Sequence, residues 1–133
     1  MTVELKIADG VATVTLKRPE KLNALNWEMR GLLTQYFSEL RFNDDVRAIL
    51  VTGEGRAFCT GADVGGMERR ELRFEREKLQ RGSHSYMRAM HAIEKPIIAA
   101  VRGPTVGIGW SIAMACDMVI ASETSRFSQI FRR

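Results

Sequence analysis

The sequence has few of the residues that hold disulfide-rich or metal-bound proteins together. Its 133 residues include two cysteines and two histidines. Cys59 and Cys116 stand in apolar contexts without metal-ligand spacing, so they favour a reduced, cytoplasmic setting over a disulfide scaffold. His84 and His91 have no third ligand of matching spacing, which favours packing or surface roles over a metal site.

Long apolar runs and charge of a single sign are missing as well. No apolar run is long enough to span a bilayer, and the first ten residues lack the basic and apolar regions of a signal peptide. The net charge is +4, and the most charged stretch, residues 68–81, interleaves acids and bases as a solvated helix does. We therefore expect a soluble globular domain without a membrane or nucleic-acid partner; the mildly basic balance fits a small anionic ligand.

What the sequence does contain is a series of short strands and helices. Pro19 ends the second strand, and Asn26 is placed to cap a helix whose apolar face runs from Trp27 to Leu40. Asp9-Gly10 forms a hairpin signal between the first two strands. The patterns predict strands at 3–7, 11–16, 48–52, 97–101 and 118–121, helices at 67–81, 85–94 and about 110–116, and a strand-like run at 125–131. We expect 48–52 and 97–101 to be fully buried. This order predicts one α/β domain over residues 1–133 with largely parallel strands.

Two of the buried strands end in glycine-rich turns, ILVTGEGRAFCTGAD and IIAAVRGPTVGIG. Glycine permits backbone conformations that expose consecutive N–H groups. Two such loops can direct two backbone donors at one oxygen, which is what an oxyanion hole requires. One donor would come from Gly61-Ala62, and the other from Gly107-Ile108-Gly109 at the start of a helix. Two tight turns without a ligand explain the spacing equally well.

Four blocks, in this order, resemble the crotonase superfamily of enoyl-CoA hydratases and isomerases. The blocks are RPEKLNALN (18–26), AFCTGAD (57–63), KPIIAAVRGPTVGIGWSIAMACD (95–117) and RFSQIF (126–131). With their connections they cover the whole chain but match only the first part of a family domain, somewhat over half. The resemblance implies a crotonase-like α/β spiral of ββα units that is truncated before the C-terminal trimerisation helices. It also implies that two backbone N–H groups stabilise a thioester enolate.

The resemblance assigns roles to individual positions of this sequence. Ala62 and Ile108 would donate to the thioester oxygen of an acyl-CoA, although the family usually has glycine at the Ile108 position, where a side chain narrows the acyl pocket. Coenzyme A would be part of the substrate, with no separate cofactor and no metal. It would be held by Lys21, Leu22, Ala24, Gly61, Asp63 and Val64, with Arg56 a weaker candidate for a phosphate contact. A homo-oligomer, a trimer or hexamer, is implied as well.

Both hydratase carboxylates are absent from the matching positions. Ser111 stands where the family has one catalytic Glu, and Phe131 where it has the other. Hydration needs proton transfer at two centres, so the resemblance favours an isomerase-like enzyme whose acid is either lost or supplied from beyond Arg133. A non-catalytic acyl-CoA-binding remnant or assembly protein stays open. A dinucleotide-binding module that uses Gly103, Gly107 and Gly109 is weaker, because the glycine spacing does not fit that fingerprint.

The other chemistry-bearing residues favour structural interpretations. Asp63 can stabilise its turn, and Asp117 can end the short helix. Cys59 is expected to be an inert, partly buried thiol, because no histidine stands in a motif with it. The glutamates of the charged helix are expected on a solvated face: Glu68, Glu71, Glu75 and Glu77. The RFSQIF segment is expected to expose an apolar face and to recruit a partner.

Overall fold

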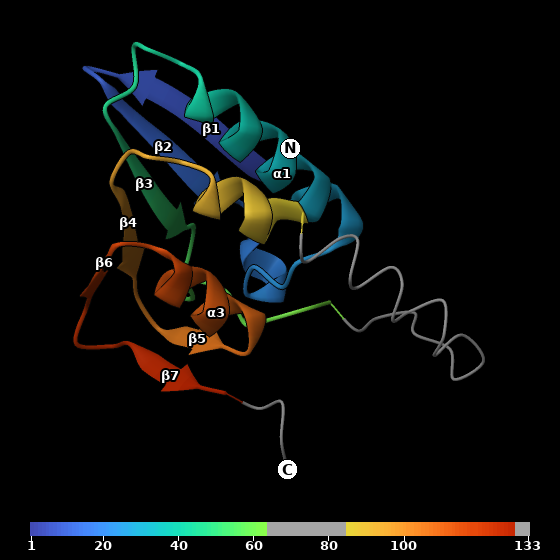
Figure 1. The fold of residues 1–133 in the computed structure, drawn as a ribbon. Helices are drawn as coiled ribbons and strands as arrows, with labels where there is room; N and C mark the ends of the chain where they lie inside the picture. Colours follow the sequence, from blue (N-terminus) through green and yellow to red (C-terminus); the bar gives the residue numbers. More distant parts are fainter. Residues whose placement is uncertain (64–84, 130–133) are drawn as a thin grey trace.

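A computed structural model describes residues 1–63 and 85–129 (Figure 1). The chain starts with a hairpin, whose turn residues Asp9 and Gly10 have positive φ angles of 53° and 80°. Short strands and helices then follow one another as the periodicity predicts. The elements are β1 (Val3–Ala8), β2 (Val11–Leu16), the 3₁₀ turn η1 (Pro19–Lys21), α1 (Trp27–Arg41), β3 (Ala48–Gly53), helical residues 85–91, β4 (Ile97–Val101), β5 (Pro104–Val106), α3 (Ile108–Ala115), β6 (Met118–Ala121) and β7 (Arg126–Ser128).

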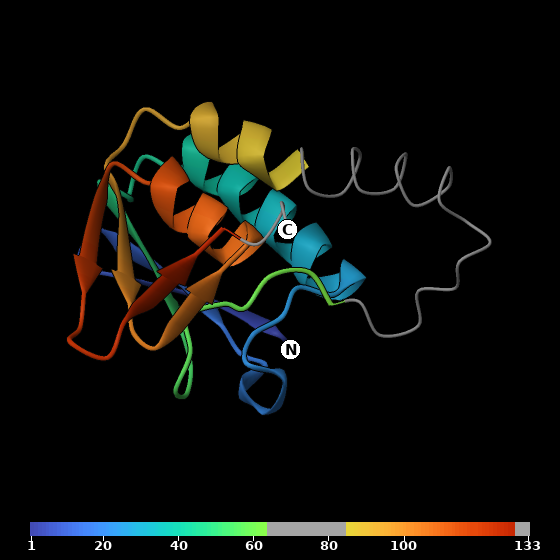
Figure 2. The ribbon, with the colours of Figure 1, turned by 90° about the horizontal axis from the view of Figure 1, so that it is seen from below.

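The strands form two sheets. The larger sheet has the order β1-β2-β3-β4-β6, with β1 antiparallel to β2 and every other pair parallel. The smaller sheet pairs β5 with β7 in parallel. The helices lie together on one side of the larger sheet (Figures 1 and 2). The predicted α/β class with largely parallel strands is confirmed.

The core lies between the larger sheet and the helices. Strands β2, β3 and β4 bury every second residue, as strands with one covered face do. Facing them, α1 buries Met29, Leu33 and Phe37. The expectation that 48–52 and 97–101 are buried on both faces is wrong, because Leu50 and Ile98 are only partly buried. A continuous apolar run does not by itself tell one covered face from two.

Most element boundaries agree with the sequence patterns, but the helix predicted at 85–94 ends at residue 91, and the described part of the run predicted at 125–131 forms a strand only over Arg126–Ser128. Asn26 caps α1 as predicted, because its side-chain oxygen accepts a hydrogen bond from the Met29 N–H at 2.9 Å. Helix α3 begins at Ile108, two residues before the predicted start, and the unpredicted strand β5 lies inside the glycine-rich turn. The predicted helix at 67–81 and its glutamates, His84, and residues 130–133 lie outside the described residues.

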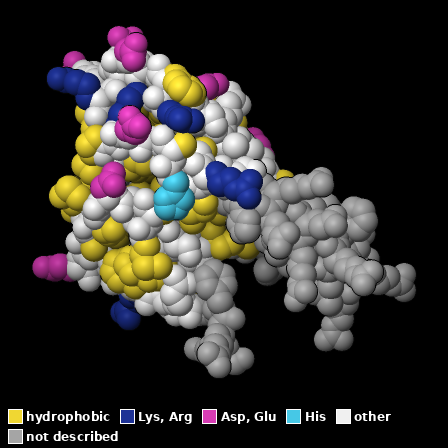
Figure 3. Space-filling view, viewed as in Figure 1, with side chains coloured by type: hydrophobic (Ala, Val, Ile, Leu, Met, Phe, Trp, Pro, Cys, Tyr) yellow, Lys and Arg dark blue, Asp and Glu magenta, His cyan; other side chains and the backbone are white. Residues whose placement is uncertain are grey.

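The end of the described chain carries the apolar surface that the sequence predicts. All four residues of β6 and all three of β7 are exposed, among them Met118, Ile120 and Phe127. Hydrophobic side chains gather over the lower left of Figure 3, where β6, β7 and α3 lie in the same view. Within the described residues, no helix has the length and apolar character of a membrane span.

A buried asparagine ties the turn after β2 to the loop after β3. The Asn23 Oδ1 accepts from the Arg18 N–H at 2.8 Å, and its Nδ2 donates to the carbonyls of Glu54 and Ala57, both at 2.9 Å. Its side chain is fully buried, and its φ of 57° lies in the left-handed region that Asn tolerates. One side chain therefore holds two loops that are 31–34 residues apart in sequence.

Replacing this asparagine should destabilise the fold strongly. Asn23→Ala leaves the buried Ala57 carbonyl and the partly buried Glu54 carbonyl without their donor and places alanine at a positive φ, so we expect a loss of about 2–4 kcal/mol in the free energy of unfolding. Asn43→Ala is the matched control, because the Asn43 side chain accepts one exposed hydrogen bond, from the Asp45 N–H. Urea denaturation of both variants measures the difference; equal losses would contradict this role of Asn23.

Candidate functional site

The two glycine-rich loops meet in space, as the sequence predicts. Cys59 and Thr105 form an isolated parallel bridge, and the Val106 N–H donates to the Cys59 carbonyl at 3.0 Å. Gly61 adopts a φ of 113°, and a Cβ built on it would lie 3.9 Å from the Ile108 nitrogen. The loop after β3 therefore runs directly alongside the start of α3.

Gly109 allows the closest part of this approach. A Cβ built on Gly109 would collide with the Cys59 carbonyl oxygen and lie 2.7 Å from the carbonyl carbon. Both collisions involve backbone, which cannot move aside as the end of a flexible side chain can. Glycine at this position thus sets the separation between the 59–62 loop and α3.

The N–H groups at this junction that have no acceptor among residues 1–63 and 85–129 include those of Ala62 and Ile108. The groups around Ala62 are engaged, since the Gly61 carbonyl accepts from Leu25 N–H at 2.7 Å and the Asp63 N–H donates to the Leu25 carbonyl at 2.9 Å. Ile108 is the first residue of α3, where N–H groups lack partners within the helix and carry the positive end of its dipole. The junction therefore presents two free donors from two different loops.

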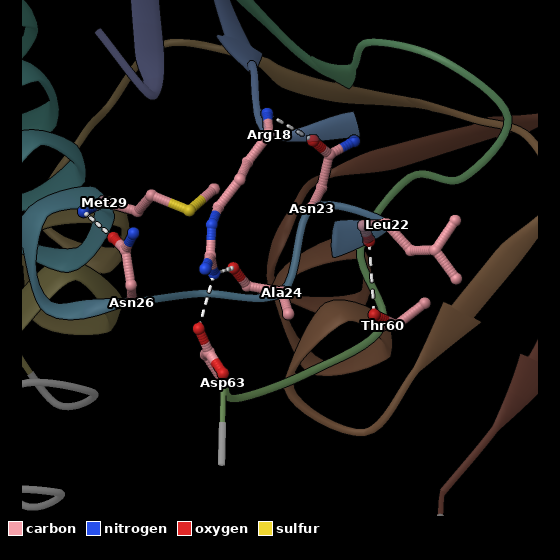
Figure 4. Close-up of polar contacts among 8 residues, drawn as sticks. All are labelled: Arg18, Leu22, Asn23, Ala24, Asn26, Met29, Thr60 and Asp63. Atoms are coloured by element: carbon pink, nitrogen blue, oxygen red, sulfur yellow. Dashed lines mark hydrogen bonds and ion pairs between the residues drawn. The ribbon is translucent and has the colours of Figure 1, made fainter. Parts of the chain in front are cut away.

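The 18–26 segment packs against the same loop (Figure 4). Arg18 Nη1 forms an ion pair with Asp63 at 2.7 Å and donates to the Ala24 carbonyl at 3.0 Å. The backbone N–H and Oγ1 of Thr60 both donate to the Leu22 carbonyl at 3.2 Å. The 18–26 segment and the 59–63 loop thus form one continuous surface next to the free N–H groups, which we call the wall.

Most residues expected to contact coenzyme A belong to this wall. Leu22, Ala24, Gly61 and Asp63 lie in it, and Lys21 ends the exposed turn η1. Val64 lies outside the described residues. The carboxylate of Asp63 pairs with Arg18 and so stabilises its own loop, whereas Arg56 is exposed on the loop after β3. Sequence reasoning missed Arg18, whose signal was its position at the head of the RPEKLNALN block.

The remaining candidates have structural surroundings. Ser111 Oγ donates back to the Gly107 carbonyl at 3.3 Å, and Phe131, the other position without its carboxylate, lies outside the described residues. Asp117 Oδ2 accepts from the Ile97 N–H at 2.8 Å, which confirms a structural role at the end of α3. His91 is exposed, and no group of three metal-ligating side chains occurs in the described part of the chain.

Both cysteines are poor nucleophiles. Burial raises the pKa of the Cys59 thiol to about 11. Burial, and then the nearby charge of Asp117, raises that of Cys116 to about 12. Thiols with such pKa values carry little thiolate at neutral pH. The expected inert role of Cys59 agrees with this environment, although the side chain is fully rather than partly buried.

Comparisons with known proteins agree with this arrangement. The profile described as enoyl-CoA hydratase/isomerase matches residues 6–133. The chain belongs to the enoyl-CoA hydratase/isomerase family. The resemblance to the crotonase superfamily is thereby confirmed.

Individual relatives show how much of the family this chain spans. A short-chain-enoyl-CoA hydratase of Clostridium acetobutylicum is 38% identical over 120 residues, covering 90% of this chain and 46% of the relative. A 1,2-epoxyphenylacetyl-CoA isomerase of Escherichia coli is 32% identical over 130 residues, covering 96% and 50%. The crystal structure of an enoyl-CoA hydratase from Mycobacterium smegmatis superposes with a TM-score of 0.89 at 32% identity, covering 96% of this chain and 50% of that one. The crotonase fold is therefore present, and the chain spans about half the length of the relatives it matches.

Two glycine-to-alanine changes in helices should have opposite effects. Gly109→Ala drives a methyl group into the Cys59 backbone, so we expect a loss of roughly 2–3 kcal/mol in the free energy of unfolding. Gly31→Ala on α1 meets nothing within 4 Å and should stabilise the fold by about 0.5–1 kcal/mol through helix propensity. Thermal unfolding of the two variants checks this; a stable Gly109→Ala protein would show that the two loops can separate at no cost.

Proposed function

We propose that this chain binds the thioester of an acyl-CoA and stabilises its enolate through the N–H groups of Ala62 and Ile108. The observation that carries the proposal is the pair of free backbone donors at the junction of the two loops. Both donors are held by backbone that is itself hydrogen-bonded, so they need little reorganisation as negative charge develops on the oxygen. The start of α3 adds the positive end of a helix dipole at the same place.

The coenzyme A part of the substrate is assigned to the wall made by the 18–26 segment and the 59–63 loop. Leu22, Ala24, Gly61 and Asp63 contribute backbone or side chains there, and Lys21 offers a cation for a phosphate. Val64 is proposed as a further residue that contacts coenzyme A. The matched relatives support this ligand class, since those of Clostridium acetobutylicum and Escherichia coli are named for enoyl-CoA and epoxyphenylacetyl-CoA substrates. No separate cofactor is proposed.

The chemistry at Ser111 favours an isomerase-like reaction over hydration. Its hydroxyl is bonded to the Gly107 carbonyl, has no carboxylate partner among the described residues, and so has no base to activate it. Hydration of an enoyl thioester needs proton transfer at two centres. Shifting a double bond moves one proton between two carbons, which a single acid-base group can do. None of the residues 1–63 and 85–129 is assigned this acid-base role. The alternative is a non-catalytic acyl-CoA binder.

Binding should depend on the thioester oxygen itself. S-butyl-CoA lacks the carbonyl oxygen of butyryl-CoA but keeps its chain, so two hydrogen bonds are the main difference. Isothermal titration should show butyryl-CoA binding roughly 5- to 100-fold more tightly. Ala62→Pro removes one donor and should shrink this ratio. Equal affinities for the two ligands in the unchanged protein would argue against the proposed pair of donors.

Hydration of crotonyl-CoA should be slow or absent. Each proton-transfer group is typically worth about 10²–10⁴-fold in rate, and both family carboxylate positions hold other residues, Ser111 and Phe131. A spectrophotometric assay at high enzyme concentration measures loss of the enoyl thioester. Turnover on the order of 10 s⁻¹ would contradict the isomerase-like assignment. Thioester binding with neither hydration nor isomerisation would favour the non-catalytic binder.

We further propose that the chain associates with itself, as a trimer or hexamer, in the reducing cytoplasm. The exposed apolar residues of β6 and β7 form a surface of the kind that usually marks an interface. Light scattering at micromolar concentration should give a mass well above the 15.0 kDa of one chain. A monomer that binds no hydrophobic dye would contradict this part of the proposal. Both cysteines are free thiols, which fits the proposed compartment.

A further inference from the structure

One buried charge has no role in the site described so far. The side chain of Arg30, on the first turn of α1, is 5% exposed. Its Nε and Nη1 atoms are enclosed and have no hydrogen-bond partner, and no ion pair of the described residues includes it. The centre of the Trp27 ring lies 4.8 Å from the guanidinium carbon.

A buried guanidinium without an anion is costly. Arginine stays protonated at any ordinary pH, so Arg30 cannot lose its charge to escape burial. Buried charges in folded proteins are therefore almost always paired or hydrogen-bonded. Arg18, 12 positions earlier, shows the usual solution, because it pairs with Asp63 and bonds to the Ala24 carbonyl. A bound anion would give Arg30 the partner that the described part of the protein does not supply.

Arg30 lies on α1, the helix that follows the 18–26 segment, and that segment is hydrogen-bonded to the 59–63 loop. Burial dominates the raised pKa of the Cys59 thiol, and the positive charge of Arg30 acts in the opposite direction and lowers that pKa. Cys59 contacts β5 and α3 through its carbonyl and comes three residues before Ala62. On the other side, Trp27 follows Leu25, which pairs with Ala62, and is half exposed. Arg30 and Trp27 thus border the junction on its α1 side.

We propose that Arg30 binds a carboxylate carried by the acyl group of the substrate, so that this protein prefers acyl-CoA thioesters with a second, free acid group. The proposal rests on the proposed function, because it assumes that the thioester oxygen lies at Ala62 and Ile108. A carboxylate accepts charge-assisted hydrogen bonds from a guanidinium, and Nε and Nη1 are the two donors that Arg30 leaves without a partner. The Trp27 ring stacks near the guanidinium and helps to hold its orientation.

Matched pairs of ligands test the proposal in the full chain. Glutaryl-CoA and pentanoyl-CoA have five acyl carbons and differ in a terminal carboxylate, and adipyl-CoA and hexanoyl-CoA form the same pair with six. We expect the acid of at least one pair to bind about tenfold or more tightly by isothermal titration. Arg30→Met should reduce that ratio to about one. Arg41→Met, an exposed position on the same helix, is the control and should keep the ratio.

Stability gives a second, independent measurement. If Arg30 has no anionic partner in the ligand-free protein, Arg30→Met replaces an unpaired buried charge with an apolar side chain of similar length. The ligand-free variant should then melt at the same temperature as the unchanged protein or at a higher one. A lower melting temperature with an unchanged ligand ratio would show a structural arginine and overturn the proposal. An equal loss of affinity for both acids, both neutral thioesters and free CoA would assign Arg30 to a coenzyme phosphate, which also overturns it. If no acyl-CoA binds more tightly than free CoA, the proposed function itself is wrong. If the neutral thioesters bind, but the unchanged protein binds each acid and its matched neutral thioester equally well, only the role of Arg30 is wrong.

Discussion

The structure depends on the close backbone contact between Cys59 and the start of α3. The Cys59 carbonyl accepts the Val106 N–H and lies where a side chain at Gly109 would stand. This contact joins a loop after β3 to a helix that begins more than 40 residues later, and it leaves no room for a side chain between them. The positions of the Ala62 and Ile108 N–H groups follow from it, because each lies within three residues of the contact.

The surrounding hydrogen bonds keep this contact from relaxing. Asn23 holds the turn after β2 against the carbonyls of Glu54 and Ala57, on the N-terminal side of Cys59. The Arg18–Asp63 ion pair holds the same turn on the C-terminal side. Both interactions are largely shielded from water, where they are stronger than on the surface. Two short segments, 18–26 and 57–63, are thereby joined into one rigid unit, and this rigidity is what a preorganised pair of donors requires.

The sequence predicts the features that depend on neighbouring residues, but not those that depend on contacts between distant segments. The hairpin turn, the Asn26 cap and the junction of the two loops could be predicted, because glycine, capping residues and period-two patterns act locally. Strand β5 could not, since three residues after a glycine carry no periodicity and pair with the distant β7 and with Cys59. The partial exposure of Leu50 and Ile98 could not either, because a continuous apolar run looks the same with one or two covered faces.

The ion pair of Arg18 and the burial of Arg30 could not be predicted from the sequence. The pairing of Arg18 with Asp63 joins residues 45 positions apart, and no local pattern predicts it. The burial of Arg30 has no sequence signal, because arginine at that position of an amphipathic helix reads as part of its polar face. Both features depend on how distant segments pack together.

A crystal structure with butyryl-CoA tests the central claim most directly. The account predicts a thioester oxygen roughly 2.7–3.1 Å from both the Ala62 and Ile108 nitrogens. An oxygen more than about 3.5 Å from both nitrogens, with the ligand bound and ordered, would contradict it.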